Sequence, residues 1–453
     1  IPGMCHVITG PRAHRTRMAP GTSLREQLEA KLEANLDTQR TLRFQEVELR
    51  KQLVAAEAAE YEKGLFSVSA SVIRSPSSGA RRRRMVFRFR NFTDRHFPPS
   101  ARSMGAWQGK TVKQLGAEIV WERASDHYAR QLSSTGLTVG TRIDLFQDEG
   151  AAFEPRDIAQ GFAGNCWLIA AFICVAEREP EAVRNAFVTK FSSHGKWRVR
   201  IFDRIANTWQ ALSIDDHIPL LRATREPVFA KSRVQDLWVV LLEKAFAKYC
   251  GGYDKLDGGT MSWALNALTG DPVFRLKRYE FAGGAWRRLD ATAGSDERRS
   301  CMGFRTTDEA FDSDDTFNVL RGYCLRGALI GASFGSSATH VAGSHSYGPL
   351  GLPTIYGLLG GHAYCVLDVK LLKFVDGTPL RLLRLRHPWG QPEWEGAWAN
   401  GANEWSEHDW VRQVCKPAGQ ENDGSFWMTW EDFAVIFDKL DVCSSIARPN
   451  VNV

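Results

Sequence analysis

The sequence predicts an α+β fold with a sizeable core. The uninterrupted apolar run at residues 166–176 is typical of a buried helix, whereas residues 380–387 alternate with the period of two that is typical of a strand. Of the 453 residues, 43% are hydrophobic and 24% are charged, which is the composition of a globular protein. Because no stretch approaches the roughly 18 apolar residues of a membrane helix, we expect no membrane span.

The first 89 residues are predicted to form an N-terminal extension. Residues 1–22 show no periodicity and are expected to be disordered. Residues 23–63 carry regularly spaced leucines among charged side chains, which predicts an amphipathic helix that packs on the body of the protein or on a partner. Arginines at 81–84 follow in a basic linker; they indicate either contact with nucleic acid or membrane, or simply a solvated edge.

The charge distribution argues against a nucleic-acid-binding protein. Residues 1–100 hold 18 Lys and Arg against 10 Asp and Glu, whereas the other 353 residues hold 40 against 42. A chain built around a phosphate-binding face would carry its basic excess on the folded body. The nine cysteines show no metal-ligand spacing, and we expect a reducing intracellular location, most simply the cytoplasm. Two polar stretches, residues 283–316 and 333–360, are predicted to be loops.

The residues that indicate chemistry begin before the apolar helix. Cys166 opens this helix, where backbone N–H groups and the helix dipole are expected to lower the pKa of its thiol. Gln160 precedes it by six residues and is a candidate donor to an oxyanion. The alternative is a buried structural cysteine at the start of a core helix.

A nucleophilic thiol needs a base, and His362 is the best candidate. It follows the glycine pair Gly360–Gly361 at the start of a predicted strand, which would hold the imidazole rigidly. The alternating strand at residues 380–387 places Leu383, Leu385 and His387 on one face and Arg384 and Arg386 on the other. His387 is therefore either the group that orients the base or a core histidine.

These residues resemble the calpain family of cysteine proteases. Residues 160–167 match the family motif Gln-Gly-x-x-Gly-Asp-Cys-Trp except for Asn165, and residues 361–364 match Gly-His-Ala-Tyr. Residues 238–248 resemble the family's Trp-x-x-Leu-Leu-Glu-Lys-Ala-Tyr-Ala-Lys helix, and residues 423–433 resemble its closing segment. The resemblance extends over about residues 90–445.

The resemblance implies a papain-like fold of two subdomains. Residues 90–275 would form a helical subdomain that carries Gln160 and Cys166, and residues 276–446 a β-rich subdomain that carries the histidine. Cys166 would then attack a peptide carbonyl, and His362 would move the proton. Gly361 and Trp389 would lie in the cleft, and the substrates would be extended segments of other proteins. No organic cofactor is implied.

Two departures from the family pattern lead to alternative functions. His387 occupies the position of the family's catalytic Asn, and a neutral imidazole is a different acceptor from an amide oxygen. The resemblance implies a calcium-dependent endopeptidase, with a rate that His387 would reduce; the alternatives are an impaired pseudo-protease that binds partners and an unrelated acyl transferase. The resemblance also implies calcium sites, a first at Asp157 and Asp236 and a weakened second at Glu393 and Asp423. Because Asn400 and Ser425 replace carboxylates at the second site, at most one well-formed site is expected.

Overall fold

The computed structural model describes the chain in segments: residues 91–106, 109–134, 144–146, 153, 158–161, 164–232, 236–279, 284–292, 300–335, 345–347, 353–388, 393–417 and 424–445. These segments all belong to one compact unit, Arg88–Val453. The predicted N-terminal helix at residues 23–63 and the basic linker lie outside the described residues. In the described part, no helix has the length and apolar character that crossing a membrane requires.

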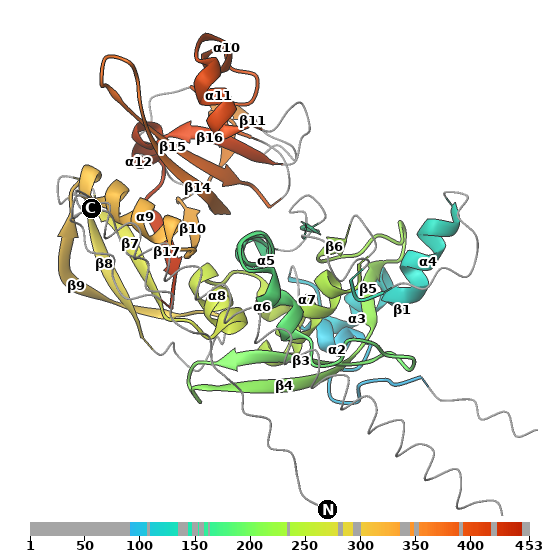
Figure 1. The fold of residues 1–453 in the computed structure, drawn as a ribbon. Coiled ribbons are helices and arrows are strands. Elements are labelled where there is room, and N and C mark those ends of the chain that lie inside the picture. Colours follow the sequence, from blue (N-terminus) through green and yellow to red (C-terminus); the bar gives the residue numbers. More distant parts are fainter. Residues whose placement is uncertain are drawn as a thin grey trace, which may run out of the picture. The chain divides into compact units, whose positions relative to one another are not determined.

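The N-terminal half of this unit is mainly helical (Figure 1). Its longest helices are α5 (Cys166–Arg178) and α7 (Trp238–Cys250), both largely buried, and a two-stranded hairpin lies between them in sequence. The other elements here are α2 (Ala101–Met104), α3 (Val112–Glu118), β1 (Ile119–Arg123), α4 (Ala124–Ser134), β2 (Ile158–Ala159), α6 (Pro180–Ala186), β3 (Lys196–Asp203), β4 (Thr208–Asp215), β5 (His217–Leu221), β6 (Lys231–Ser232), η3 (Tyr253–Leu256) and α8 (Met261–Thr269).

The C-terminal half is built on an antiparallel sheet of eight strands in the order β16-β15-β14-β10-β17-β7-β8-β9. Three short strands form a separate small sheet in the order β11-β12-β13. The bounds are β7 (Val273–Tyr279), β8 (Ala285–Thr292), β9 (Gly303–Phe311), α9 (Ser313–Leu325), β10 (Leu329–Ser333), β11 (His345–Tyr347), β12 (Pro353–Ile355), β13 (Leu358–Leu359), β14 (Ala363–Lys373), β15 (Pro379–Arg386), α10 (Glu404–Glu407), α11 (Asp409–Cys415), β16 (Ser425–Thr429), α12 (Trp430–Ile436) and β17 (Lys439–Cys443).

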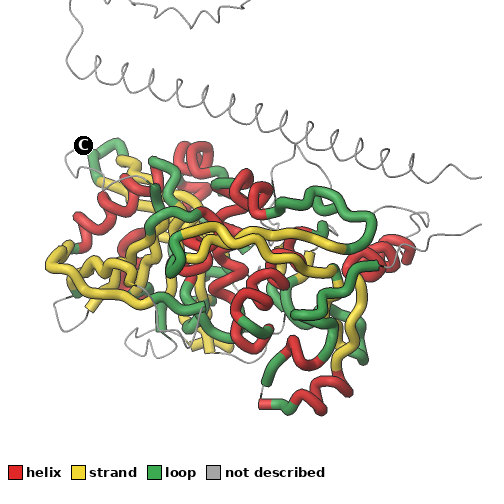
Figure 2. Tube along the Cα trace, turned by 90° about the horizontal axis from the view of Figure 1, so that it is seen from below, coloured by secondary structure: helices red, strands yellow, loops and turns green. Residues whose placement is uncertain are grey.

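Both faces of β14, a strand inside the large sheet, are buried over its first half. Successive side chains of a strand point to opposite faces. Ala363, Cys365 and Leu367 pack in the core that contains α5, α7 and α8, whereas Tyr364 and Val366 pack in a second core with α9 and α12. The sheet therefore joins the helical half to the rest of the unit, and Figure 2 shows helices and strands mixed throughout it.

The structure confirms an α+β fold and the three elements that were expected to carry the chemistry. The predicted helix at residues 166–176 is α5, and the predicted strands are β14 and β15. One detail of β15 is wrong: Arg386, expected on a polar face, is only 2% exposed. Because the sheet is covered on both sides, alternation in β15 does not separate buried from exposed positions.

The two predicted loops are wrong in part. Residues 283–316 contain β8 and β9, and residues 333–360 contain β11, β12 and β13. The register of β8 and β9 shifts between Arg287, which pairs with Ala310, and Leu289, which pairs with Thr306; β9 therefore carries two extra residues there, while β8 pairs regularly with β7. This bulge removes the period of two that identifies a strand in sequence.

Candidate active site

Cys166 is the first residue of α5 and lies against the start of β14. The backbone N–H groups of Ala363 and Trp167 point at its sulfur, which links α5 directly to the strand that follows His362. Burial nevertheless raises the pKa of the Cys166 thiol, and these N–H groups offset the rise only in part. The expected lowering of this pKa is therefore wrong, because desolvation outweighs the N–H groups at the helix start.

Close contacts surround Gly161, five residues before Cys166, and Trp167, the residue after it. A Cβ atom at Gly161 would lie 1.9 Å from the carbonyl oxygen of Phe229, so only glycine fits there. On the other side of Cys166, the indole N–H of Trp167 donates to the carbonyl oxygen of Leu256 over 3.0 Å. A Cβ atom at Gly259 would meet the same indole at 2.4 Å. The start of α5 is thus held from two sides.

His362 immediately precedes β14, as the sequence predicted. Gly361 has φ +74°, a left-handed conformation that favours glycine, and its N–H donates to the carbonyl oxygen of Phe334 over 2.9 Å. Burial lowers the pKa of His362 to about 4, so the imidazole is neutral at pH 7. A neutral imidazole is the form that accepts a proton.

His387 follows β15 and is completely buried beside His362. The centroids of the two imidazole rings are 5.3 Å apart, and the Tyr364 ring lies 5.0 Å from His387 on β14. The backbone N–H of His387 donates to the carbonyl oxygen of Gly424 over 2.9 Å. The structure therefore brings the two predicted histidines together.

The remaining predicted residues are placed in part. Gln160 directly follows β2 and adjoins Gly161, the residue packed on Phe229. Trp389, Asp157 and Asp423 lie outside the described residues, so their predicted roles stay predictions.

Two of the predicted calcium ligands are described. The Asp236 side chain is buried. Glu393 accepts hydrogen bonds at both carboxylate oxygens, from Asn400 Nδ2 over 2.7 Å and from the Gly424 N–H over 3.1 Å. The same Asn400 nitrogen donates to the carbonyl oxygen of Ser425 over 2.7 Å. The Asn400 amide nitrogen therefore lies between a Glu393 oxygen and the Ser425 carbonyl oxygen. A calcium ion would need these oxygens as ligands, so this arrangement does not fit calcium at the second site.

Sequence reasoning gave no role to Glu243, which contacts the residue before the nucleophile. Its Oε1 accepts a hydrogen bond from Asn165 Nδ2 over 2.6 Å, and both side chains are buried. The available signal was a carboxylate inside the apolar run Leu241–Phe246, where a charged residue needs a partner.

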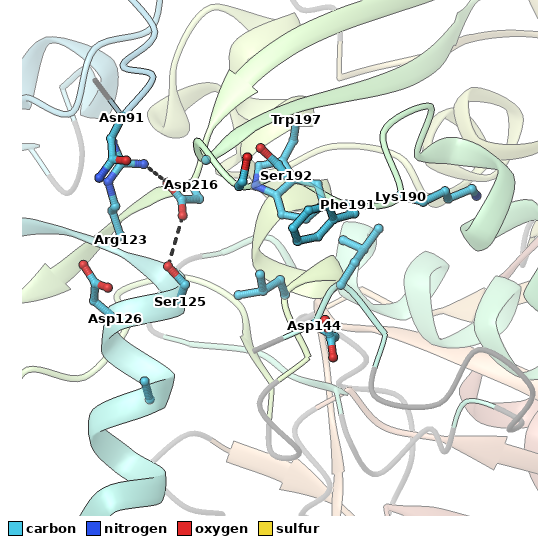
Figure 3. A pocket seen from close by; sticks show the side chains of 15 residues that line it. Asn91, Arg123, Ser125, Asp126, Asp144, Lys190, Phe191, Ser192, Trp197 and Asp216 are labelled. Atoms are coloured by element: carbon cyan, nitrogen blue, oxygen red, sulfur yellow. Dashed lines mark hydrogen bonds and ion pairs between the residues drawn. The ribbon is translucent and has the colours of Figure 1, made fainter. Parts of the chain in front are cut away.

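A cavity of about 410 Å³ lies away from these residues and is lined in part by Asp126, Asp144, Lys190 and Trp197. In Figure 3, Arg123 and Ser125 both point at Asp216 in its wall, and Ser125 Oγ donates to Asp216 Oδ2 over 3.2 Å. Arg123 forms an ion pair with Asp216 and also donates to the carbonyl oxygen of Phe92. These contacts tie the start of the described chain to β1 and the residue before β5.

A thiol at a helix start lies against a strand that begins after a neutral histidine, and this arrangement is typical of proteins with a cysteine nucleophile. Comparison with known proteins gives the family. The family described as "Calpain family cysteine protease" matches residues 92–444. The chain belongs to this family.

Similar curated proteins include plant and animal members of the family. The chain is 31% identical over 360 residues to "Calpain-type cysteine protease ADL1" of Oryza sativa subsp. japonica, covering 78% of this chain and 14% of that protein. It is 30% identical over 380 residues to "Calpain-5" of Caenorhabditis elegans, covering 78% of this chain and 50% of that protein. The chain therefore spans only a minor part of the plant relatives and about half of the nematode one.

Proposed function

We propose that the chain is a cysteine endopeptidase that makes limited cuts in other proteins inside the cell. The observation that carries this proposal is the thiol of Cys166 at the start of α5, against the strand that His362 precedes. Family membership supports a peptidase, and the neutral His362 supports a proton acceptor.

In the proposed reaction, the Cys166 sulfur attacks the peptide carbonyl carbon while its proton passes to His362. The carbon–oxygen π pair becomes an oxyanion, which the Cys166 N–H and the Gln160 side chain stabilise. Collapse of this intermediate breaks the C–N bond, and the leaving amine takes the proton from His362. Water then hydrolyses the thioester with His362 as base, releasing the acid and the thiol. His387 would orient His362 and stabilise its charged form.

The pKa of Cys166 is raised and that of His362 is lowered. Both shifts disfavour a preformed thiolate–imidazolium pair, so the proton would pass from Cys166 to His362 while the sulfur attacks. The same two shifts support the alternative, an impaired pseudo-protease that keeps the fold to bind partners. Labelling with a peptide that carries an electrophilic group separates the two. If the protein is a protease, the peptide reagent labels Cys166 faster than the same electrophile without a peptide does. Equal labelling rates for the two reagents would contradict the endopeptidase proposal and favour the alternative.

His387→Asn tests the proposed orienting role. If His387 orients His362 less well than an amide would, this substitution raises kcat with KM little changed. If His387 is only a core residue, kcat stays within about twofold while the melting temperature falls, because a buried ring is lost.

We propose calcium at no more than the first of the two predicted sites, where Asp157 and Asp236 would hold it. The bound ion would neutralise these carboxylates and hold their segments together. The test is the shift of melting temperature on adding calcium to the wild type, Asp236→Asn and Glu393→Gln. The proposal expects the shift to disappear in Asp236→Asn alone; a loss in Glu393→Gln would contradict it.

A further inference from the structure

Glu243 is a buried carboxyl that the proposed reaction does not use. It lies on α7 and is only 2% exposed. Both of its oxygens accept the backbone N–H of Ala230, over 2.9 and 3.0 Å, and Oε1 also accepts Asn165 Nδ2 over 2.6 Å. A buried carboxyl with donors from two distant segments, residues 165 and 230, ties those segments together.

The first segment leads directly to the nucleophile. Asn165 is completely buried and is the residue before Cys166, whose backbone N–H is one expected donor to the oxyanion. The Asn165 side chain forms no cap hydrogen bond with α5, so its described contact is the one to Glu243. Its position therefore sets the direction of the peptide group that joins it to Cys166.

The second segment leads to the other expected donor. The Ala230 N–H bound by Glu243 adjoins Phe229, whose carbonyl oxygen packs against Gly161 so closely that no Cβ would fit. Gly161 directly follows Gln160. The Phe229 ring is itself held by stacking on Tyr253, with ring centroids 4.3 Å apart. A shift of residues 229–230 would therefore move the backbone that carries Gln160.

We infer that Glu243 is a positioning residue for the oxyanion hole, because one carboxyl fixes the backbone next to both Cys166 and Gln160. This inference rests on the proposed function. Misplacing a catalytic group by about 1 Å can lower the rate about 100-fold. A carboxyl that fixes the backbone next to both oxyanion donors would therefore keep the reaction rate high.

The charge state of Glu243 is consistent with this role. Burial raises the pKa of Glu243 to about 8, against which the hydrogen bonds from Ala230 and Asn165 act only in part. A carboxyl with a raised pKa carries less negative charge than an exposed glutamate at the same pH, so it opposes the developing oxyanion less. The neighbouring Lys244 is paired with Asp215 instead.

The test compares two reactions of Cys166, one that places an oxygen in the oxyanion hole and one that does not. With a peptide aldehyde, the thiol adds across the C=O bond: the S–C bond forms, and the carbonyl oxygen, resting in the hole, receives the thiol proton. Alkylation by iodoacetamide forms an S–C bond and expels iodide, and it develops no oxyanion. We therefore measure aldehyde affinity and alkylation rate in the wild type and in Glu243→Gln.

The inference expects Glu243→Gln to weaken aldehyde binding about 10- to 100-fold while alkylation changes less than about threefold. Asn165→Ala is the second variant; it removes one of the two tethers without removing a helix cap, and it should weaken aldehyde binding in the same selective way. Asn266→Ala is the matched control, because this residue is also buried in a helix and its amide donates to the carbonyl oxygen of Asp271 over 2.8 Å.

Each outcome decides the inference. Unchanged aldehyde affinity in Glu243→Gln and Asn165→Ala would overturn it. The control Asn266→Ala is expected to change aldehyde binding and alkylation by similar factors, and the same parallel change in Glu243→Gln would also overturn the inference. If the wild type binds the aldehyde but hydrolyses no peptide, the endopeptidase proposal is wrong, and the comparison of wild type with Glu243→Gln still tests the role of Glu243. A wild type that does not bind the aldehyde at all would overturn the inference, because no working hole would exist.

Discussion

Replacing Lys244 by Met is predicted to destabilise the protein by about 3–5 kcal/mol at pH 7. Lys244 and Asp215 are both completely buried and form an ion pair. The Lys244 ammonium also donates to the carbonyl oxygen of His217 over 2.6 Å. Met fills most of the volume of the lysine, but it leaves the Asp215 carboxylate with only its other donors, which include the N–H groups of Asp94 and His217 over 2.7 and 2.9 Å. The cost is that of an uncompensated buried charge.

The pH dependence of this loss follows from Asp215. Burial alone would raise the pKa of Asp215, but hydrogen bonding from His217 and the charge of Lys244 hold it below its usual range. A lowered carboxyl pKa gives stability that is present above the unfolded value, about 3.9, and is lost as the pH falls through the folded value. Without Lys244 this pKa rises, so protonation relieves the buried charge at a higher pH. The difference between wild type and variant should therefore shrink on acidification.

Urea unfolding at pH 7 and pH 4 measures both effects, with Lys231→Met as the control. Lys231 pairs with Glu226 over 2.8 Å, but both side chains are partly exposed, at 28% and 45%, and such pairs contribute about 0–1 kcal/mol. A loss below about 1 kcal/mol in Lys244→Met, or a loss that grows at pH 4, would refute the reasoning.

Three further predictions concern the site. Gly161→Ala should lower the melting temperature and kcat together, because its Cβ would meet the Phe229 carbonyl oxygen. The control Gly116→Ala, whose Cβ would have its nearest contact at 3.9 Å, should change neither quantity. Equal effects of the two substitutions would contradict this prediction. The alkylation rate of Cys166 should keep rising above about pH 8.5, because burial raises its pKa; a plateau below pH 7 would instead indicate a preformed ion pair. Asn400→Asp should create or enlarge a calcium-induced rise in melting temperature, because a carboxylate replaces the amide next to Glu393, and an unchanged response would count against the account of the second site.

The elements that carry the chemistry could be predicted because their patterns are local. The apolar run of α5 and the alternation in β15 are properties of neighbouring residues, and the structure confirms both elements. The strands β8 and β9 could not be predicted in the same way, since β9 carries two extra residues between Thr306 and Ala310 that interrupt its alternation.

The properties that depend on distant contacts could not be predicted. The helix start at Cys166 indicates a lowered pKa, but burial in the folded chain raises it, and the sequence does not show that burial. The contact of Glu243 with Asn165 joins residues 78 positions apart. The sequence shows that a buried carboxylate needs a partner, and only the fold shows which partner it has.

Hydrolysis of unfolded casein by the purified protein tests the central claim most directly. The wild type is compared with Cys166→Ala, each with calcium and with a chelator. The account predicts limited cleavage by the wild type that is abolished in Cys166→Ala. Cleavage that survives in Cys166→Ala, or no cleavage by the wild type under either condition, would contradict the proposed endopeptidase.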